Sequence, residues 1–158
     1  MTAELIHATA IAINHHGVLL VGPSGSGKSD LAVRLIDRGA VLISDDAVCI
    51  GQIEQKPVLH AAPNIEGRIE LRGVGIIEVQ HTPKAAMRMV VEMIAPDERI
   101  PPENLSADIA GFTVPLVKIA AFESSAPLKV EYALRSLIDA DLWPVPLPSV
   151  RPTESLAT

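Results

Sequence analysis

Residues 22–29 read GPSGSGKS, and no other stretch of the chain says more about its fold. Gly22 and Gly27 enclose four residues and are followed directly by Lys28 and Ser29, which is the spacing of a phosphate-binding loop. Glycines let successive backbone N–H groups turn inward around an anion, while the lysine and serine can reach phosphate oxygens and Mg²⁺. We therefore expect a nucleoside triphosphate with Mg²⁺ as the ligand, held by all eight residues: Gly22, Pro23, Ser24, Gly25, Ser26, Gly27, Lys28 and Ser29.

The residues on either side of the loop supply the context that this motif needs. The run 17–21 is apolar and β-branched, as in a buried strand. The run 30–38 carries apolar residues at helical spacing and ends at Gly39, a good residue to terminate a helix. A purely structural glycine turn is the alternative, and the strand before the loop and the helix after it make that alternative less probable than nucleotide binding.

Length and composition limit the classes of protein to consider. The chain has 158 residues, which suits one domain, and 48% of them are hydrophobic but only 3% aromatic, so the core must be aliphatic. A net charge of −6 without a basic cluster argues against nucleic acid as a partner. The single Cys49 excludes an internal disulfide and fits a reducing compartment. No apolar run approaches the length of a membrane span, so we expect a cytoplasmic protein.

Short apolar runs separated by turn residues predict an α/β domain that is rich in β-strands. Residues 86–94 alternate, which predicts a half-buried strand with Met87, Met89, Val91 and Met93 on one face. Residues 1–143 should form one catalytic domain, and the proline-rich residues 144–158 should be disordered or docked in extended form. The expected strands are 5–13, 17–21, 40–44, 48–53, 69–71, 75–79, 86–94 and 112–119, the expected helices are 30–38 and 125–140, and 95–108 should be a loop.

An acidic pair, Asp45 and Asp46, follows the expected strand 40–44, one helix beyond the phosphate-binding loop. Strand ends and nucleotide phosphates meet at the same edge of such a sheet. One carboxylate can organise Mg²⁺, and the other can accept a proton from an incoming hydroxyl group during phosphoryl transfer. The alternative is that one of the two acids is a simple turn residue.

Three motifs in order resemble the catalytic, C-terminal domain of bacterial HPr kinase/phosphorylase. His7 precedes the loop by about fifteen residues, the acidic pair follows the next strand, and residues 70–77 read ELRGVGII. The family carries a histidine, an Asp-Asp pair and a signature similar to Glu-Ile-Arg-Gly-Leu-Gly-Ile-Ile at these places. The agreement covers the first half of the chain well and is looser beyond residue 80.

The resemblance implies a role for each matching residue. His7 matches an active-site histidine of the family. Judged without the family, a lone histidine on a strand is more often a core or edge residue with its hydrogen bonds satisfied. Asp46 accepts the proton of the target serine, and Asp45 assists the metal or orients Asp46. The catalytic residues implied are His7, Lys28, Asp46 and Arg99, and the implied Mg²⁺ ligands are Ser29 and Glu70. Asp45 is the third expected metal ligand, because of its place in the acidic pair.

The resemblance also implies a fold and an activity. The fold is a phosphate-binding-loop fold related to phosphoenolpyruvate carboxykinase, with a bent, mixed β-sheet and few helices. The activity is ATP-dependent phosphorylation of a serine in the phosphocarrier protein HPr or a close relative, by an enzyme that is commonly oligomeric. By the same resemblance, we expect a short form of the enzyme that lacks the family's separate N-terminal domain.

One departure from the family concerns the reverse reaction. Relatives that also remove the phosphate carry a basic stretch similar to Pro-Val-Lys-Pro-Gly-Arg before the last helix, whereas residues 120–125 here read AAFESS. Without these cations the segment cannot hold a free phosphate or a phosphoserine in the same way, which argues against phosphorolysis.

Two other functions stay open. A small-molecule kinase could share the loop, but no clustered arginines or lysines and no aromatic lid suggest its substrate pocket. An ATP-binding regulatory module with little transfer activity is the second alternative, and the presence of both Asp46 and Glu70 argues against it.

Overall fold

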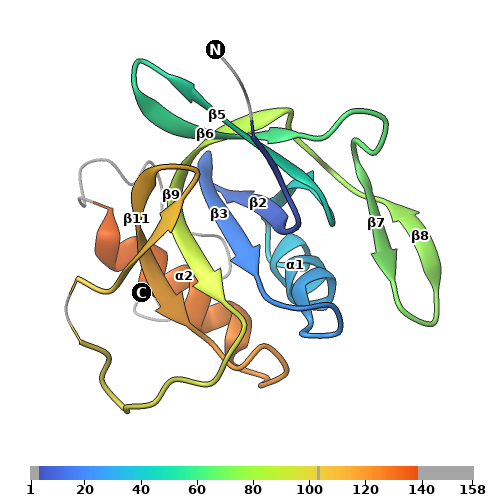
Figure 1. Cartoon of the computed structure of the whole chain (residues 1–158). Helices are drawn as coiled ribbons and strands as arrows, with labels where there is room; N and C mark the ends of the chain where they lie inside the picture. Colours follow the sequence, from blue (N-terminus) through green and yellow to red (C-terminus); the bar gives the residue numbers. More distant parts are fainter. Residues whose placement is uncertain (1–3, 103, 139–158) are drawn as a thin grey trace, which may run out of the picture.

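The computed structural model describes residues 4–102 and 104–138. The expected tail, 144–158, lies outside the described residues. In Figure 1 a strongly curved sheet carries two helices, and a separate two-stranded hairpin projects from one end. The elements are β1 (Glu4–Ile6), β2 (Thr9–Ile13), β3 (His16–Val21), α1 (Lys28–Asp37), β4 (Val41–Ser44), β5 (Val48–Ile53), β6 (Lys56–Ala61), β7 (Arg68–Leu71), β8 (Gly75–Glu78), β9 (Lys84–Glu92), β10 (Ser106–Ile109), β11 (Phe112–Lys118) and α2 (Ala126–Leu137).

The large sheet contains both parallel and antiparallel pairs, and β3, the strand that leads into the phosphate-binding loop, lies between β9 and β2. The order of its main path is β1-β5-β6-β9-β3-β2-β4, with β11 also paired to β9 and β10 to β11. On one side of β3 lie β2 and β4, both antiparallel to their neighbours, and on the other side lie β9 and then β11, parallel to β3. The strand that feeds the phosphate-binding loop is therefore flanked on both sides by strands that bring residues to the same edge.

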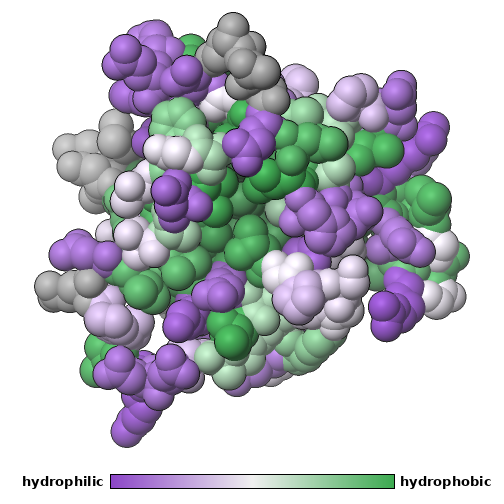
Figure 2. All heavy atoms as spheres, in the orientation of Figure 1, coloured by the Kyte–Doolittle hydropathy of each residue, from purple (hydrophilic) through white to green (hydrophobic). Residues whose placement is uncertain are grey.

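Apolar side chains pack on both faces of the sheet, because alternate residues of a strand point to opposite faces. Val18 and Leu20 of β3 belong to the cluster that also contains Leu31 and Leu35 of α1, while Leu19 packs into the cluster on the opposite face. Figure 2 shows apolar side chains gathered over β3, β9 and β11, with hydrophilic ones around them. The core is aliphatic, as the composition predicts.

The alternation predicted for residues 86–94 is wrong at Met87. The pairing with β3 shifts between Gly17 and Val18, so that Met87 lies opposite Gly17 and Met89 opposite Val18. Arg88 is thus the extra residue of a β-bulge, and one extra residue reverses the face of everything on one side of it. Met87 consequently packs in a different cluster from Met89 and Val91.

The strand predicted over 5–13 is two strands, and the break falls at His7. β1 pairs with β5, whereas β2 pairs with β3 and β4. The expected strands 5–13 and 17–21 meet in the hairpin of β2 and β3, whose two-residue turn has Asn14 and His15 both at positive φ, as a type I′ turn requires. The bend between β1 and β2 matters for function because it frees His7 from the sheet.

Two further expectations about the last third need correction. Residues 95–108 are not entirely loop, since β10 forms a hairpin with β11. The final helix, α2, begins next to Ser125 with Pro127 in its first turn, as predicted, but it ends at Leu137, and Ile138 is extended. No helix of the described residues is long and apolar enough to cross a membrane.

A bidentate ion pair ties the end of α1 to α2. Arg38 donates from Nε and Nη2 to the two carboxylate oxygens of Glu131 at 2.9 and 2.8 Å, and only 3% of the Glu131 side chain is exposed. This hydrogen bond raises the pKa of Arg38 above its usual value. The pair holds α2 and the segment before it against α1, close to the phosphate-binding loop.

Replacing Arg38 with methionine should lower the free energy of unfolding by about 3 kcal/mol, because the buried Glu131 carboxylate loses its bidentate donor. Urea denaturation at neutral pH measures the change. The double variant Arg38→Met/Glu131→Leu should regain most of the loss, since it no longer buries a charge. The exposed pair between Lys129 and Glu123 is the matched control: Lys129→Met should cost less than about 0.5 kcal/mol. A similar small cost for Arg38→Met would contradict the structural role.

Candidate active site

The phosphate-binding loop lies between β3 and α1, as predicted, and its glycines are required by its shape. Gly25 and Gly27 have φ values of +84° and +97°, in the left-handed region that disfavours a Cβ. A Cβ on Gly22 would lie 2.6 Å from the Ser26 hydroxyl oxygen. Gly27 is also the N-cap of α1, so the unpaired N–H groups of the helix's first turn open toward the loop.

Lys28 is buried and its ammonium group spans the loop. Its Nζ donates hydrogen bonds to the carbonyl oxygens of Gly22 at 2.7 Å and Pro23 at 3.1 Å. Only 7% of the residue is exposed, and neither acceptor carries a charge. A buried cation with neutral partners is unfavourable unless an anion joins it. The loop is therefore built for a charged ligand such as a phosphate group.

The two acids of the pair face opposite environments. Asp45 is buried, and its carboxylate accepts hydrogen bonds from the hydroxyls of Ser29 at 2.7 Å and Thr9 at 2.9 Å and from the backbone N–H of Glu70 at 3.2 Å. It thus joins the loop, β2 and β7. The next residue, Asp46, has a side chain that is 76% exposed.

The backbone of Asp46 explains the difference. Its φ is +69°, a left-handed conformation that costs a residue other than glycine free energy of the order of 1 kcal/mol. This turn sends consecutive side chains in different directions, Asp45 inward and Asp46 into solvent. The carboxylate of Asp46 lies 3.3 Å from Nδ1 of His7, which the bend between β1 and β2 exposes. Strain of this kind is often retained where a side chain has a task.

One cleft of about 510 Å³ brings most of the predicted residues together. His7 and Asp46 line it, together with Lys28 and Ser29 of the loop and Glu70 of β7. Gly22, Pro23 and Ser26 belong to the loop but not to the lining of the cleft. The full lining is His7, Thr9, Ser24, Gly25, Gly27, Lys28, Ser29, Asp30, Asp46, Glu70, Leu71, Arg72 and Phe122.

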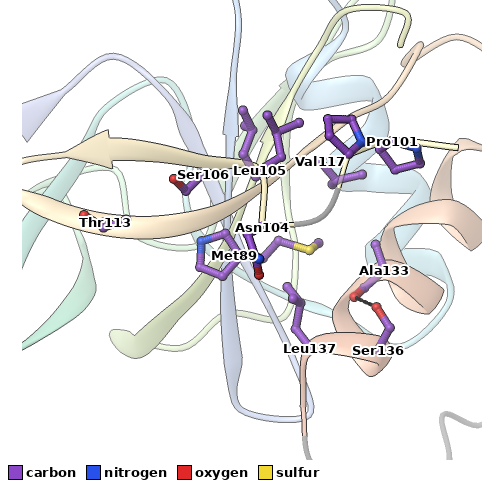
Figure 3. A pocket seen from close by; sticks show the side chains of 13 residues that line it. Met89, Pro101, Asn104, Leu105, Ser106, Thr113, Val117, Ala133, Ser136 and Leu137 are labelled. Carbon is purple, nitrogen blue, oxygen red and sulfur yellow. Dashed lines mark hydrogen bonds between the residues drawn. The ribbon is translucent and has the colours of Figure 1, made fainter. Parts of the chain in front are cut away.

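Arg99 does not lie in this cleft. It belongs to the loop after β9 and lines a different hollow with Asp97, Lys118 and Lys129. A third hollow, of about 550 Å³, lies between residues 101–102 and 104–106, β11 and α2, and Figure 3 shows the mainly apolar side chains that surround it. Among the residues that the structure describes, those lining that hollow carry no charge. The cleft at the loop, in contrast to that hollow, combines a buried cation with carboxylates.

The cleft offers oxygen ligands that fit Mg²⁺. Ser29 and Glu70 line the cleft, and the buried Asp45 carboxylate, which does not line it, accepts a hydrogen bond from the Ser29 hydroxyl at 2.7 Å. Hydroxyl and carboxylate oxygens are the ligands this ion prefers. Within residues 4–102 and 104–138 no group of three or more His, Cys, Asp or Glu side chains is arranged to hold a metal. The donors present suit an ion that also takes phosphate oxygens and water, which is how Mg²⁺ binds beside nucleotides.

Thr9 and Phe122 are among the residues of the site that the sequence analysis missed. Thr9 is fully buried and bonds to Asp45; the only available signal was a hydroxyl side chain in an apolar strand. Phe122 lines the cleft from the segment between β11 and α2. Arg34 of α1 donates hydrogen bonds to the carbonyl oxygens of Ala121 and, at 3.0 Å, Glu123, and so holds this segment against the helix. Nothing local in residues 120–125 predicts this contact.

Comparison with known proteins agrees with this geometry. The family model described as the HPr Serine kinase C-terminal domain matches residues 1–141. The HPr kinase/phosphorylase of Polaromonas sp. (strain JS666) is 32% identical over 149 residues, which is 84% of this chain and 47% of the relative. That of Chlorobium phaeobacteroides (strain BS1) is 32% identical over 126 residues, 72% of this chain and 37% of the relative. The chain therefore spans less than half the length of these relatives.

A solved structure shows the same fold. The HPr(Ser) kinase/phosphatase from Coxiella burnetii superposes with a TM-score of 0.74 at 26% sequence identity, covering 84% of this chain and 89% of that one. The prediction of a phosphate-binding-loop fold with a bent, mixed sheet and few helices is confirmed. With the loop, the acidic pair and the curved sheet all in place, this chain belongs to the family of HPr serine kinase C-terminal domains.

Proposed function

We propose that this chain is an ATP-dependent protein serine kinase, and that its acceptor is the phosphocarrier protein HPr or a close relative. The observation that carries the proposal is the exposed Asp46, paired with His7 in the same cleft as the phosphate-binding loop. An exposed carboxylate at the mouth of a cleft can meet a hydroxyl group that arrives on another protein. A small-molecule kinase would instead be expected to enclose its acceptor.

Phosphoryl transfer needs a general base, groups that bind the phosphates, and release of ADP as the leaving group. The serine oxygen of the acceptor bonds to the γ-phosphorus of ATP while the bond from that phosphorus to the β,γ-bridging oxygen breaks, releasing ADP. Asp46 takes the serine proton, and His7, 3.3 Å away, shares it or stabilises the carboxylate beforehand. Lys28 and the loop N–H groups balance the charge on the phosphates.

The metal site forms part of the same proposal. Ser29, Glu70 and Asp45 would hold Mg²⁺, with Asp45 fixing the Ser29 hydroxyl through the 2.7 Å hydrogen bond. When bound, Mg²⁺ neutralises phosphate charge. Asp45 also bonds to the N–H of Glu70, so β7 is kept close to the loop. Arg99, which lies outside the cleft, takes no part in this mechanism.

We infer that transfer to the carrier is the main direction. The segment 120–125 holds no cation of its own, and its Glu123 is paired with Lys129 at 2.7 Å. It therefore lacks the positive charge needed to hold inorganic phosphate for the reverse reaction. A cytoplasmic location belongs to the same proposal, because ATP is the substrate.

Incubating the purified chain with HPr and ATP labelled at the γ-phosphate tests the proposal. The label should appear on a serine of HPr and should require Mg²⁺. Tight ATP binding without any labelled HPr would favour the regulatory alternative instead. A second reaction with phosphoserine-HPr and inorganic phosphate should release little phosphate, and rapid release would contradict the preferred direction.

A further inference from the structure

The side chain of Phe122 lies against the phosphate-binding loop, in a segment whose backbone is held by hydrogen bonds. A Cβ placed on Gly27 would lie 2.9 Å from Cζ of Phe122, so the tip of the ring touches the N-cap of α1. The ring is nevertheless 69% exposed and lines the cleft. Isolated exposed apolar residues are ordinary on protein surfaces. Phe122 differs from such residues because hydrogen bonds hold both residues next to it in the chain, Ala121 and Glu123.

The backbone on either side of Phe122 is restrained. Arg34 donates to the carbonyl oxygens of Ala121 and Glu123, the residues directly before and after the phenylalanine. Ala121 is itself buried at 4% exposure, and Glu123 N–H bonds to the Ala120 carbonyl oxygen at 3.2 Å. The ring is thus presented to the cleft by a fixed segment, which lowers the entropy cost of binding against it.

The topology places Phe122 on the side of the loop opposite to the transfer chemistry. His7 lies in the bend before β2 and Asp46 in the turn after β4, on one side of β3. Phe122 follows β11, which lies beyond β9 on the other side of β3. A nucleotide whose γ-phosphate lies near Asp46 and whose remaining phosphates follow the loop therefore extends its nucleoside toward Phe122.

From this arrangement we propose that Phe122 is the stacking platform for the adenine base, a binding residue for ATP that contacts the base and not the phosphates. The assignment rests on the proposed function, since it needs ATP in the cleft. A phenyl ring offers a flat apolar face that a purine can cover, and it has no hydrogen-bonding group. It should therefore strengthen the binding of any purine nucleotide relative to a polyphosphate without a base. The segment 120–125, which contains no lysine or arginine, thereby has a role in binding the phosphoryl donor.

Binding of Mg-ATP and of Mg-tripolyphosphate, measured calorimetrically on the whole chain, separates the base from the phosphates. Phe122→Ala should raise the Kd of ATP about tenfold or more, because a stacked base is lost, and should leave the Kd of tripolyphosphate within about twofold. Phe122→Trp should bind ATP as the wild type does or better. The matched control is Tyr132→Ala on α2, another exposed aromatic that does not line the cleft, and its ATP affinity should not change.

Each other outcome is decisive. Equal loss of affinity for ATP and tripolyphosphate in Phe122→Ala means that the ring only supports the loop, which overturns the assignment. Unchanged ATP affinity with a raised KM for HPr makes it an acceptor contact and overturns it as well. A wild-type chain that binds neither probe overturns the proposed function together with this inference, whereas a wild type that binds both leaves the function standing whatever Phe122→Ala does.

Discussion

Replacing Asp46 with asparagine is expected to lower kcat for phosphorylation of HPr by about three orders of magnitude, with the Kd of ATP unchanged within about twofold. Asparagine keeps the shape of the side chain but cannot take the serine proton. It also tolerates the left-handed conformation that Asp46 adopts at φ +69°, so the backbone should not move. The measurement is the initial rate of HPr labelling at saturating ATP, together with calorimetric binding of ATP.

The control for Asp46→Asn is an acid outside the cleft. Asp97 is 87% exposed and lies near Lys118, so Asp97→Asn should leave kcat unchanged. Far-ultraviolet circular dichroism and urea denaturation of Asp46→Asn should match the wild type, because its carboxylate is exposed. A loss of less than tenfold in kcat would show that another group accepts the proton, and His7 would then be the first residue to substitute.

Substituting Lys28 with methionine should reduce kcat/KM for ATP by about three orders of magnitude or more while leaving the protein at least as stable as the wild type. The activity falls because the ammonium group balances charge on the phosphates, and such a preorganised contribution alone is worth about 10² to 10³ in rate. The stability holds because the wild type buries this charge against two neutral carbonyl oxygens, which is an unfavourable arrangement. Transfer rates and urea denaturation measure the two effects.

Separating the two effects is what makes Lys28→Met informative. A variant that loses both activity and several kcal/mol of stability would mean that Lys28 mainly holds the loop together. Lys118→Met is the matched control, since Lys118 lies on β11 and forms an exposed ion pair with Asp97 at 3.6 Å. It should change neither quantity appreciably.

The local part of the site could be predicted from sequence because its parts are neighbours in the chain. The spacing from Gly22 to Ser29, the apolar strand before it and the helix after it specify the loop through backbone geometry alone. The pair at Asp45 and Asp46 could be placed at the same edge because strand ends after a phosphate-binding loop meet there.

Predictions that needed one-residue accuracy failed where the backbone departs from regular structure. A bulge at Arg88 moves Met87 to the opposite face from Met89, and a bend at His7 divides one expected strand into two. Both departures depend on which strand each residue pairs with. Periodicity along the chain contains no information about those partners. The sequence pattern therefore predicts continuous strands where the structure has a bulge and a bend.

The sequence by itself determined that the chain holds a phosphate-binding loop followed by a carboxylate pair, because these features depend on local spacing and backbone conformation. Only the tertiary structure decided which acid is buried against Ser29 and which faces solvent beside His7. It alone also brought Phe122 to the loop from nearly a hundred residues away and left Arg99 outside the cleft. The physical reason is that a side chain's burial and partners are set by the elements packed around it, and strands far apart in the chain supply most of those elements here.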